Sequence, residues 1–337
     1  MNKVELLIIG CGAIAEKAHL PALRRIPQAY VSALVDKNAN RAQELKKKFH
    51  LKDALVFEDH LKALEEVNPD AVLILTPPST HPQLIEEFAK AKIHIFCEKP
   101  IATNLRDARK LIQLISKPTK IMIGFSNRFL PQIIKMYELA KSGEIGTTIA
   151  MITLFSQDIG KWPSVSAYQF RKELGGGALF DSGMHYADLI RWFLGEVVSV
   201  ESKVASYDKK YSSIDDFANI QLEFENGSIG TIYVLWCGPM MGEFFVMGDK
   251  GILKADSLSN NVQVFKKEFW ILPPVEIKAR QAISPYHSEL LHFIKCIQNN
   301  KEVEVGVTEG IEALRIILAA SRSAETGKKI FLKNFEG

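Results

Sequence analysis

Up to about residue 124, short apolar runs alternate with longer stretches in which apolar residues recur every three or four positions. The short runs are rich in β-branched residues and predict strands at 4–9, 30–35, 54–57, 71–75, 93–96 and 120–123. The longer stretches predict helices such as 40–49, 80–90 and 104–115, the last with Asn104 as its N-cap. Strands and helices that alternate in this way predict one complete doubly wound domain with a parallel sheet.

Beyond residue 124 the pattern changes to longer strands joined by tight turns. The predicted strands are 147–155, 197–206, 218–224, 228–235, 243–247, 251–255 and 262–265, and the predicted helices are 131–141, 178–193, 284–299 and 308–326. Asn226-Gly227 predicts a hairpin turn in which both residues have a positive φ. The change of pattern indicates two domains, 1–124 and 125–337. The second is an α+β domain built on a large, open, mainly antiparallel sheet of six or seven strands.

Composition and charge exclude several classes of protein. The 337 residues are 47% hydrophobic and 24% charged, as in an ordinary globular protein, and a net charge of +3 does not indicate a nucleic-acid partner. The first residues lack the length and cleavage site of a signal peptide, so we expect none, and no apolar run approaches the roughly 20 residues of a membrane span. The four cysteines lie far apart without a CxxC pair, which indicates reduced thiols and neither disulfides nor a zinc site. We therefore expect a cytoplasmic protein with no membrane partner.

The first predicted strand runs into Gly10-Cys11-Gly12-Ala13-Ile14-Ala15, a GxGxxA sequence that opens a helix. In a Rossmann domain the two glycines allow a tight turn and a close approach of the pyrophosphate, and the small third residue lets the helix pack on the strand. Asp36 ends the second strand, where a carboxylate accepts hydrogen bonds from the adenosine ribose and repels a 2′-phosphate. This favours NAD over NADP. Lys37 and Arg41 leave NADP open, and the alternative for Asp36 is a turn residue.

Two more segments follow strands at the carboxyl edge of the same sheet, where ligands of such folds bind. Strand 71–75 leads into Thr76-Pro77-Pro78-Ser79-Thr80-His81, and strand 93–96 leads into Cys97-Glu98-Lys99-Pro100. His81 is a candidate for cofactor contact, with a local hydrogen-bonding role as the equal alternative. A lysine directly after a buried run has no structural explanation in the sequence.

These motifs, in this order and spacing, resemble the glucose-fructose oxidoreductase, inositol dehydrogenase and rhizopine-catabolism family of NAD(P)-dependent oxidoreductases. The resemblance covers nearly the whole chain. It implies that Thr76 and Pro77 lie along the cofactor, that Glu98 helps to hold it, and that Lys99 touches both the nicotinamide and the substrate.

The segment Gly175-Gly176-Gly177-Ala178-Leu179-Phe180-Asp181-Ser182-Gly183-Met184-His185-Tyr186-Ala187-Asp188 is the second signature. Three glycines predict a loop, and Asp181, His185 and Asp188 then share one face of the helix that follows. Taken alone, such a face is either a wet surface or a reactive site, and it lacks a third ligand for zinc. The segment resembles the family's second signature, which implies His185 as general base and Asp181 as the residue that contacts substrate and tunes it.

Two arginines are candidates for substrate contact, each with a structural ion pair as the equal alternative. Arg128 matches an arginine often found in the family at the start of the second domain. Arg171 follows Phe170 where many relatives have tryptophan-arginine, which puts only the stacking role of the tryptophan in doubt.

The resemblance implies a dehydrogenase that transfers a hydride between NAD(P) and a secondary alcohol or ketone of a sugar, cyclitol or sugar derivative. We expect Lys99, Asp181 and His185 to converge on one substrate hydroxyl, with no metal. Three alternatives stay open: NAD-dependent glycoside cleavage without net redox change, a non-enzymatic NAD-sensing regulator, and oxidation of a trans-dihydrodiol or another non-sugar alcohol. The open sheet leaves one face available to a partner subunit, and the resemblance implies a homodimer or homotetramer.

Overall fold

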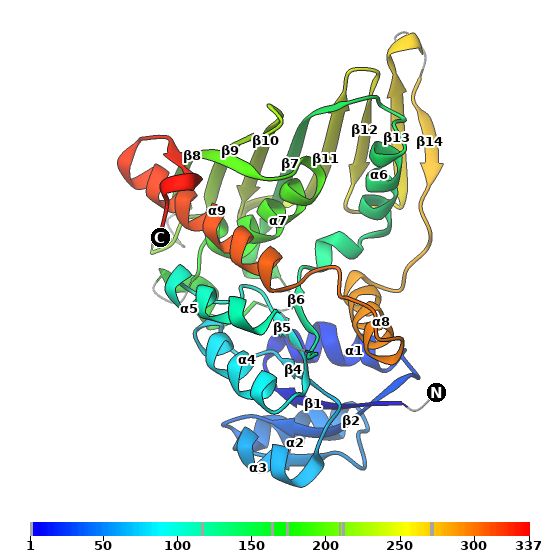
Figure 1. Ribbon diagram of the computed structural model, residues 1–337, viewed down its shortest axis with the longest axis vertical. Coiled ribbons are helices and arrows are strands. Elements are labelled where there is room, and N and C mark those ends of the chain that lie inside the picture. Colours follow the sequence, from blue (N-terminus) through cyan, green and yellow to red (C-terminus); the bar gives the residue numbers. More distant parts are fainter. Residues whose placement is uncertain are drawn as a thin grey trace. The chain divides into compact units, whose positions relative to one another are not determined.

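The computed structural model describes residues 3–115, 118–162, 165–172, 175–208, 210, 213–269 and 273–337. The chain forms two compact units. The first contains the chain up to Phe125, a short stretch that ends at Ser166, and Tyr286–Ile311. The second contains Ser126–Trp162, Ala167–Pro285 and Glu312–Gly337. Figure 1 labels the elements of both units.

Within the described residues, the first unit has a parallel sheet of six strands in the order β3-β2-β1-β4-β5-β6. The strands are β1 (Val4–Ile9), β2 (Ala29–Val35), β3 (Leu55–Phe57), β4 (Ala71–Ile74), β5 (His94–Glu98) and β6 (Ile121–Gly124). The helices are α1 (Leu20–Leu23), α2 (Ala39–Lys48), α3 (His60–Val67), α4 (His81–Lys90), α5 (Leu105–Lys110) and α8 (Pro285–Gln298), and Asn104 caps α5 as predicted. This strand order is that of a doubly wound dinucleotide-binding sheet, which confirms the predicted fold class.

Helix α8 belongs to the first unit although it lies far along the chain. Its buried residues Leu290, Phe293 and Ile294 form one apolar face, and the ring of Phe293 contacts that of Phe96 on β5 at 5.9 Å between centroids. The sequence boundary near residue 124 assigned this helix to the second domain. An amphipathic pattern shows that a helix has a buried face, but it does not identify the sheet that covers it.

The second unit has, in its described part, a sheet of nine strands in the order β14-β13-β12-β11-β7-β10-β9-β8-β15. The strands are β7 (Thr148–Asp158), β8 (Val197–Ala205), β9 (Phe217–Phe224), β10 (Ile229–Leu235), β11 (Cys237–Gly248), β12 (Gly251–Asp256), β13 (Asn261–Lys266), β14 (Val275–Lys278) and β15 (Ile330–Phe331). The helices are α6 (Pro131–Lys141), α7 (Gly183–Leu194) and α9 (Val307–Thr326), and the π-helix η8 (Ala178–Ser182) leads into α7.

The prediction of a mainly antiparallel sheet is confirmed, but the predicted number of strands was too low. The short edge strands β14 and β15 have too few residues to give a periodic signal. One pair, β7 with β10, is parallel, so the sheet is mixed.

The turn between β9 and β10 also differs from the prediction. Gly227 has a φ of +80°, whereas Asn226 is not among the residues with positive φ, so the turn is not the predicted two-residue type. Phe224 N–H donates to the Ser228 carbonyl, which closes a three-residue loop with its glycine in the left-handed region. The Asn226 side chain accepts the Ser228 N–H at 3.0 Å and so supplies a second bond to the turn.

The core of each unit is apolar, and β1, β4 and β5 are almost fully buried, as parallel strands covered on both faces must be. Within the described part of the chain, no helix is long and apolar enough to cross a membrane.

Candidate active site

The glycine loop after β1 has the geometry that a dinucleotide requires. Gly10 has a φ of +95°, and a Cβ there would lie 2.6 Å from the Leu75 carbonyl oxygen, so only glycine allows the close approach of the loops after β1 and β4. A Cβ at Gly12 would meet nothing within 4 Å, so space beside the loop is open. Ala13 and Ile14 are half-buried and Ala15 is buried. The residues present therefore fit a bound pyrophosphate.

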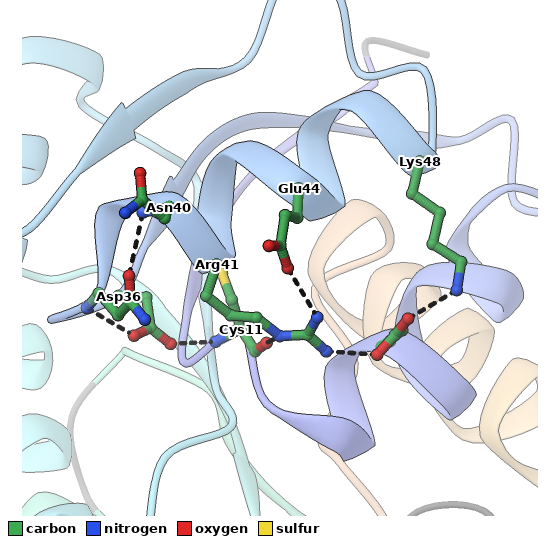
Figure 2. Close-up of polar contacts among 8 residues, drawn as sticks. Cys11, Asp36, Asn40, Arg41, Glu44 and Lys48 are labelled. Carbon is green, nitrogen blue, oxygen red and sulfur yellow. Dashed lines mark hydrogen bonds and ion pairs between the residues drawn. The ribbon is translucent and has the colours of Figure 1, made fainter.

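Asp36 and Arg41 form a polar network beside this loop (Figure 2). Asp36 Oδ2 accepts the Cys11 N–H at 2.8 Å, and Asp36 Oδ1 accepts the Asn38 N–H at 2.9 Å. Arg41 Nε donates to the Cys11 carbonyl at 3.0 Å, and its Nη atoms contact the carboxylates of Glu44 and Glu16. Asp36 is thus fixed at the end of β2.

Glu16 forms an ion pair with the Arg41 guanidinium, whose Nε donates to the Cys11 carbonyl. Hydrogen bonds from Lys48 and Arg41 lower the pKa of Glu16 to about 2, so this carboxylate stays ionised at neutral pH. Lys37, the other basic residue named for NADP, is exposed.

The loop after β4 contains the remaining predicted cofactor residues. Thr76 Oγ1 lies 2.6 Å from Thr80 Oγ1, and Pro77 is exposed. His81 is fully buried, with Nδ1 at 2.7 Å from the Pro100 carbonyl and Nε2 at 2.8 Å from the Thr76 carbonyl. Burial lowers the pKa of His81. Both ring nitrogens contact main-chain carbonyls, which favours the local role for His81 over contact with the cofactor.

The end of β5 presents one lysine from a buried segment. From Ile95 to Ala102 every residue is buried except Lys99, which is half-buried. Its N–H donates to Glu98 Oε2 at 3.1 Å, and Glu98 Oε1 lies 2.7 Å from His19 Nε2. The Lys99–Pro100 peptide bond is cis. The backbone at Lys99 is therefore fixed by the preceding glutamate.

In the second unit, glycines shape the loop that precedes α7. A Cβ at Gly176 would lie 2.4 Å from the Gln169 carbonyl oxygen. Gly177 has a φ of +103°, and a Cβ there would lie 2.4 Å from Asp215 Oδ1. Asp215 receives the Ala178 N–H at its carbonyl and the Leu179 N–H at Oδ2, and burial raises the pKa of Asp215. This aspartate caps the first turn of the helical segment.

Asp181 and His185 lie at the start of that helix. Asp181 is buried and accepts a hydrogen bond from Gln169 Nε2 at 3.1 Å and one from Tyr168 Oη at 3.4 Å. From residue 181 to residue 190, His185 is half-buried and every other residue is buried. The helix thus presents an imidazole from a buried segment, as β5 presents a lysine in the first unit.

Asp188, the third polar residue of the predicted face, binds Arg128. Arg128 Nε donates to Asp188 Oδ2 at 2.7 Å and Arg128 Nη2 donates to Asp188 Oδ1 at 2.6 Å, with both side chains at most 3% exposed. The guanidinium also lies over the ring of Trp192, 5.2 Å from its centroid. This geometry supports the structural alternative for Arg128. Arg171 is exposed at the entry to the glycine loop.

A pocket in the second unit was not predicted. It has a volume of about 530 Å³ and is lined mainly by Gln157, Asp158, Lys161, Trp162, Cys237 and Met240. Trp236, which precedes Cys237 but does not line the pocket, donates its indole N–H to Ser182 Oγ at 2.8 Å. Gln157 is 5% exposed, and its Oε1 has no hydrogen-bond partner among the described residues. These residues belong to no sequence motif, so only the pairing of β7 with β11 brings them together.

Comparison with known proteins identifies two family models in the chain. Residues 4–125 match the NAD-binding Rossmann domain of the Gfo/Idh/MocA oxidoreductase family, and residues 133–254 match a C-terminal domain of the same family. A myo-inositol 2-dehydrogenase of Thermotoga maritima is 28% identical and covers 98% of this chain and 99% of its own. An uncharacterised oxidoreductase of Bacillus subtilis is 29% identical over 98% of this chain and 96% of its own. A levoglucosan dehydrogenase in complex with NADH and L-sorbose has the same fold, with a TM-score of 0.89, 20% identity and coverage of 98% and 99%.

Proposed function

The chain belongs to the Gfo/Idh/MocA family of oxidoreductases with an NAD(P)-binding Rossmann domain, and from that premise we propose that it oxidises a secondary alcohol of a sugar or cyclitol, or reduces the matching ketone. The observation that supports this most directly is the pair of half-buried groups, Lys99 and His185, each presented by an otherwise buried segment. Relatives named as dehydrogenases of inositol and of D-apiose support the substrate class.

We propose that Lys99 and His185 act on the same substrate hydroxyl. His185 accepts the hydroxyl proton, because an imidazole titrates near neutral pH, and the Lys99 ammonium stabilises the charge that develops on the oxygen. Asp181, fixed by Gln169 and Tyr168, orients the substrate and the imidazole. A bound nicotinamide would supply the hydride acceptor, which no side chain can provide. In the reverse direction, His185 returns the proton to the ketone oxygen.

We propose NAD as the preferred cofactor. Asp36 follows β2, the position at which a Rossmann carboxylate would accept the adenosine ribose hydroxyls, and Arg41, a candidate cation for a 2′-phosphate, already contacts two glutamates. Asp36→Ala should weaken NAD binding by about 10- to 100-fold, the value of hydrogen bonds to a charged group, and change NADP binding less. Lys37→Ala is the matched control. Tighter binding of NADP than of NAD by the wild type, in a fluorescence titration, would refute the assignment.

The substrate can be identified by a spectrophotometric panel. The protein is incubated with NAD and, separately, with cyclitols, aldoses, anhydrosugars and sugar nucleotides, and NADH absorbance is followed. Turnover of a polyol is expected. Turnover of trans-dihydrodiols alone, or tight NAD binding with no turnover of any alcohol, would replace this proposal with one of the alternatives named above.

We also propose that one face of the sheet in the second unit, which bears partly exposed apolar side chains, joins copies of this chain. Paired residues form an apolar row across five strands, Phe265, Ile252, Met247, Ala150 and Ile229. Ile229, Ile252 and Phe265 are 54%, 37% and 38% exposed. An apolar row of this kind on one sheet face fits a self-complementary interface. Ile252→Glu should reduce the mass by light scattering to that of a monomer, with Leu61→Glu in the first unit as control; a monomeric wild type would refute the proposal.

A further inference from the structure

The first unit contains a buried cluster of three ionisable residues, and the proposed reaction assigns no role to two of them, His19 and Glu289. His19 ends the π-helix η1 (Ala15–His19), Glu98 ends β5, and Glu289 lies in α8. His19 and Glu289 are fully buried and Glu98 is 8% exposed. One ligand-type atom from each of the three lies within 4.8 Å of the other two.

The surroundings of the cluster are apolar. The His19 ring packs edge-on against Phe96 at 5.4 Å and against Tyr286 at 5.5 Å between centroids. Among the described residues, the His, Cys, Asp and Glu side chains gathered with Glu289 are Glu98 from β5 and His19 from η1, and the phenol ring of Tyr286 lies against the His19 ring. Two carboxylates are therefore buried beside a single imidazole.

Of the two carboxyl groups, Glu289 has the less favourable surroundings for a negative charge. Neither of its oxygens has a hydrogen-bond donor among the described residues. An ionised carboxylate without a donor is costly in an apolar interior, so the group takes up a proton instead. Burial first, and the charge of Glu98 second, raise the pKa of Glu289 well above its ordinary value. A neutral carboxylic acid beside a carboxylate can donate its proton to that neighbour.

We propose that Glu289 is a positioning residue that stays protonated and donates a hydrogen bond to Glu98, and that this bond fixes Glu98 and, through it, the backbone of Lys99. Glu98 Oε2 accepts the Lys99 N–H and Glu98 Oε1 lies 2.7 Å from His19 Nε2, so two groups already hold the carboxylate and Glu289 would be the third. The part of the inference that concerns Lys99 rests on the proposed function. The protonation of Glu289 does not.

A divalent cation is the competing occupant of this cluster. It would require both carboxylates ionised and the His19 nitrogen unprotonated. The 2.7 Å between His19 Nε2 and Glu98 Oε1 is a hydrogen-bond distance, which places a proton between them. This favours the proton over the cation.

Two variants of the full chain distinguish a protonated Glu289 from a bound divalent cation. Glu289→Gln keeps the shape and a donor but cannot ionise, whereas Glu289→Met keeps the length and removes the donor. Because the folded wild type binds a proton that the unfolded chain releases above pH 4.5, its stability should fall relative to Glu289→Gln as pH rises from 4.5 towards the folded pKa. The relative unfolding constant should rise about tenfold per pH unit in that window.

Substrate-free measurements decide the protonation. A carboxylic acid C=O band in the infrared spectrum at pH 7 should be present in the wild type and absent from Glu289→Gln. A pH-independent stability difference, or a stoichiometric divalent metal that is lost in Glu289→Gln, would overturn the proposal.

Turnover measurements then decide the link to Lys99. Glu289→Gln should keep kcat within about threefold, and Glu289→Met should lower kcat by about tenfold, the worth of one hydrogen bond, at unchanged NAD affinity. Equal loss in both variants would overturn the positioning role. If the wild type turns over no alcohol, the proposed function and the link to Lys99 fail together, while the stability and infrared results still decide the protonation.

Discussion

The ion pair between Arg128 and Asp188 can be tested by removing one charge at a time. Asp188→Asn keeps the shape of the side chain and leaves the guanidinium, which is 3% exposed, without its carboxylate. Breaking a buried pair from one side costs about 3–5 kcal/mol, because the remaining charge stays desolvated. In a unit of this size, each kcal/mol of lost stability lowers the melting temperature by about 2–4 °C. The melting temperature of Asp188→Asn should therefore fall by roughly 6–20 °C.

A double variant separates charge from packing. Arg128→Met with Asp188→Leu replaces the pair by apolar side chains of similar size, and its stability should return to within about 1 kcal/mol of the wild type. Glu196→Gln is the matched control, because Glu196 pairs with Arg191 but is 52% exposed; its loss should cost no more than about 1 kcal/mol.

Calorimetry and turnover are measured on the wild type, Asp188→Asn, the double variant and Glu196→Gln, and together they show whether Arg128 acts through structure or through the substrate. If the double variant regains both stability and turnover, Arg128 acts through structure. If it regains stability while KM for the alcohol stays high, Arg128 contacts the substrate. An Asp188→Asn protein that melts within 2 °C of the wild type would refute the reasoning, because a desolvated guanidinium cannot lose its carboxylate without cost.

Three further outcomes are expected. Lys99→Met and His185→Asn should each lower kcat by about 10²–10⁴-fold while NAD affinity by fluorescence titration changes less; wild-type turnover in His185→Asn would exclude it as the base. In thermal melts, Gly177→Ala should destabilise the second unit by more than Gly143→Ala. Both positions have positive φ, but only Gly177 has a carboxylate 2.4 Å from the new Cβ. Equal losses of stability would show that backbone strain alone accounts for the effect. If the pocket that Gln157 lines binds the substrate, Gln157→Leu should raise KM for the alcohol and leave NAD affinity unchanged; an unchanged KM would show that substrate binds elsewhere.

Local signals in the sequence predicted most elements well. The predicted ranges 4–9 and 131–141 coincide with β1 and α6, because the first is a short apolar run that ends at Gly10 and the second has a helical period and begins at Pro131. The Asn104 cap and the tight glycine turn at Gly10 follow from the chemistry of single residues.

Features that depend on distant partners could not be predicted in the same way. The sequence placed Asp188 on one face with Asp181 and His185, but its partner Arg128 lies 60 residues away, and no local pattern indicates that pairing. The same holds for Glu289, which reads as an ordinary polar position in an amphipathic helix until Glu98 and His19 are found beside it. The parallel pairing of β7 with β10 is likewise a property of the whole sheet.

Because α8 belongs to the first unit, that unit cannot finish folding until late in the synthesis of the chain. A ribosome releases the six strands of the nucleotide-binding sheet early, but Phe293, which packs on Phe96, follows only after most of the second unit has been synthesised. A fragment cut at Phe125 would therefore expose Phe96 and open His19 and Glu98 to water on the side that Glu289 occupies. A stand-alone NAD-binding unit would need residues 286–311 fused back onto it through a new linker.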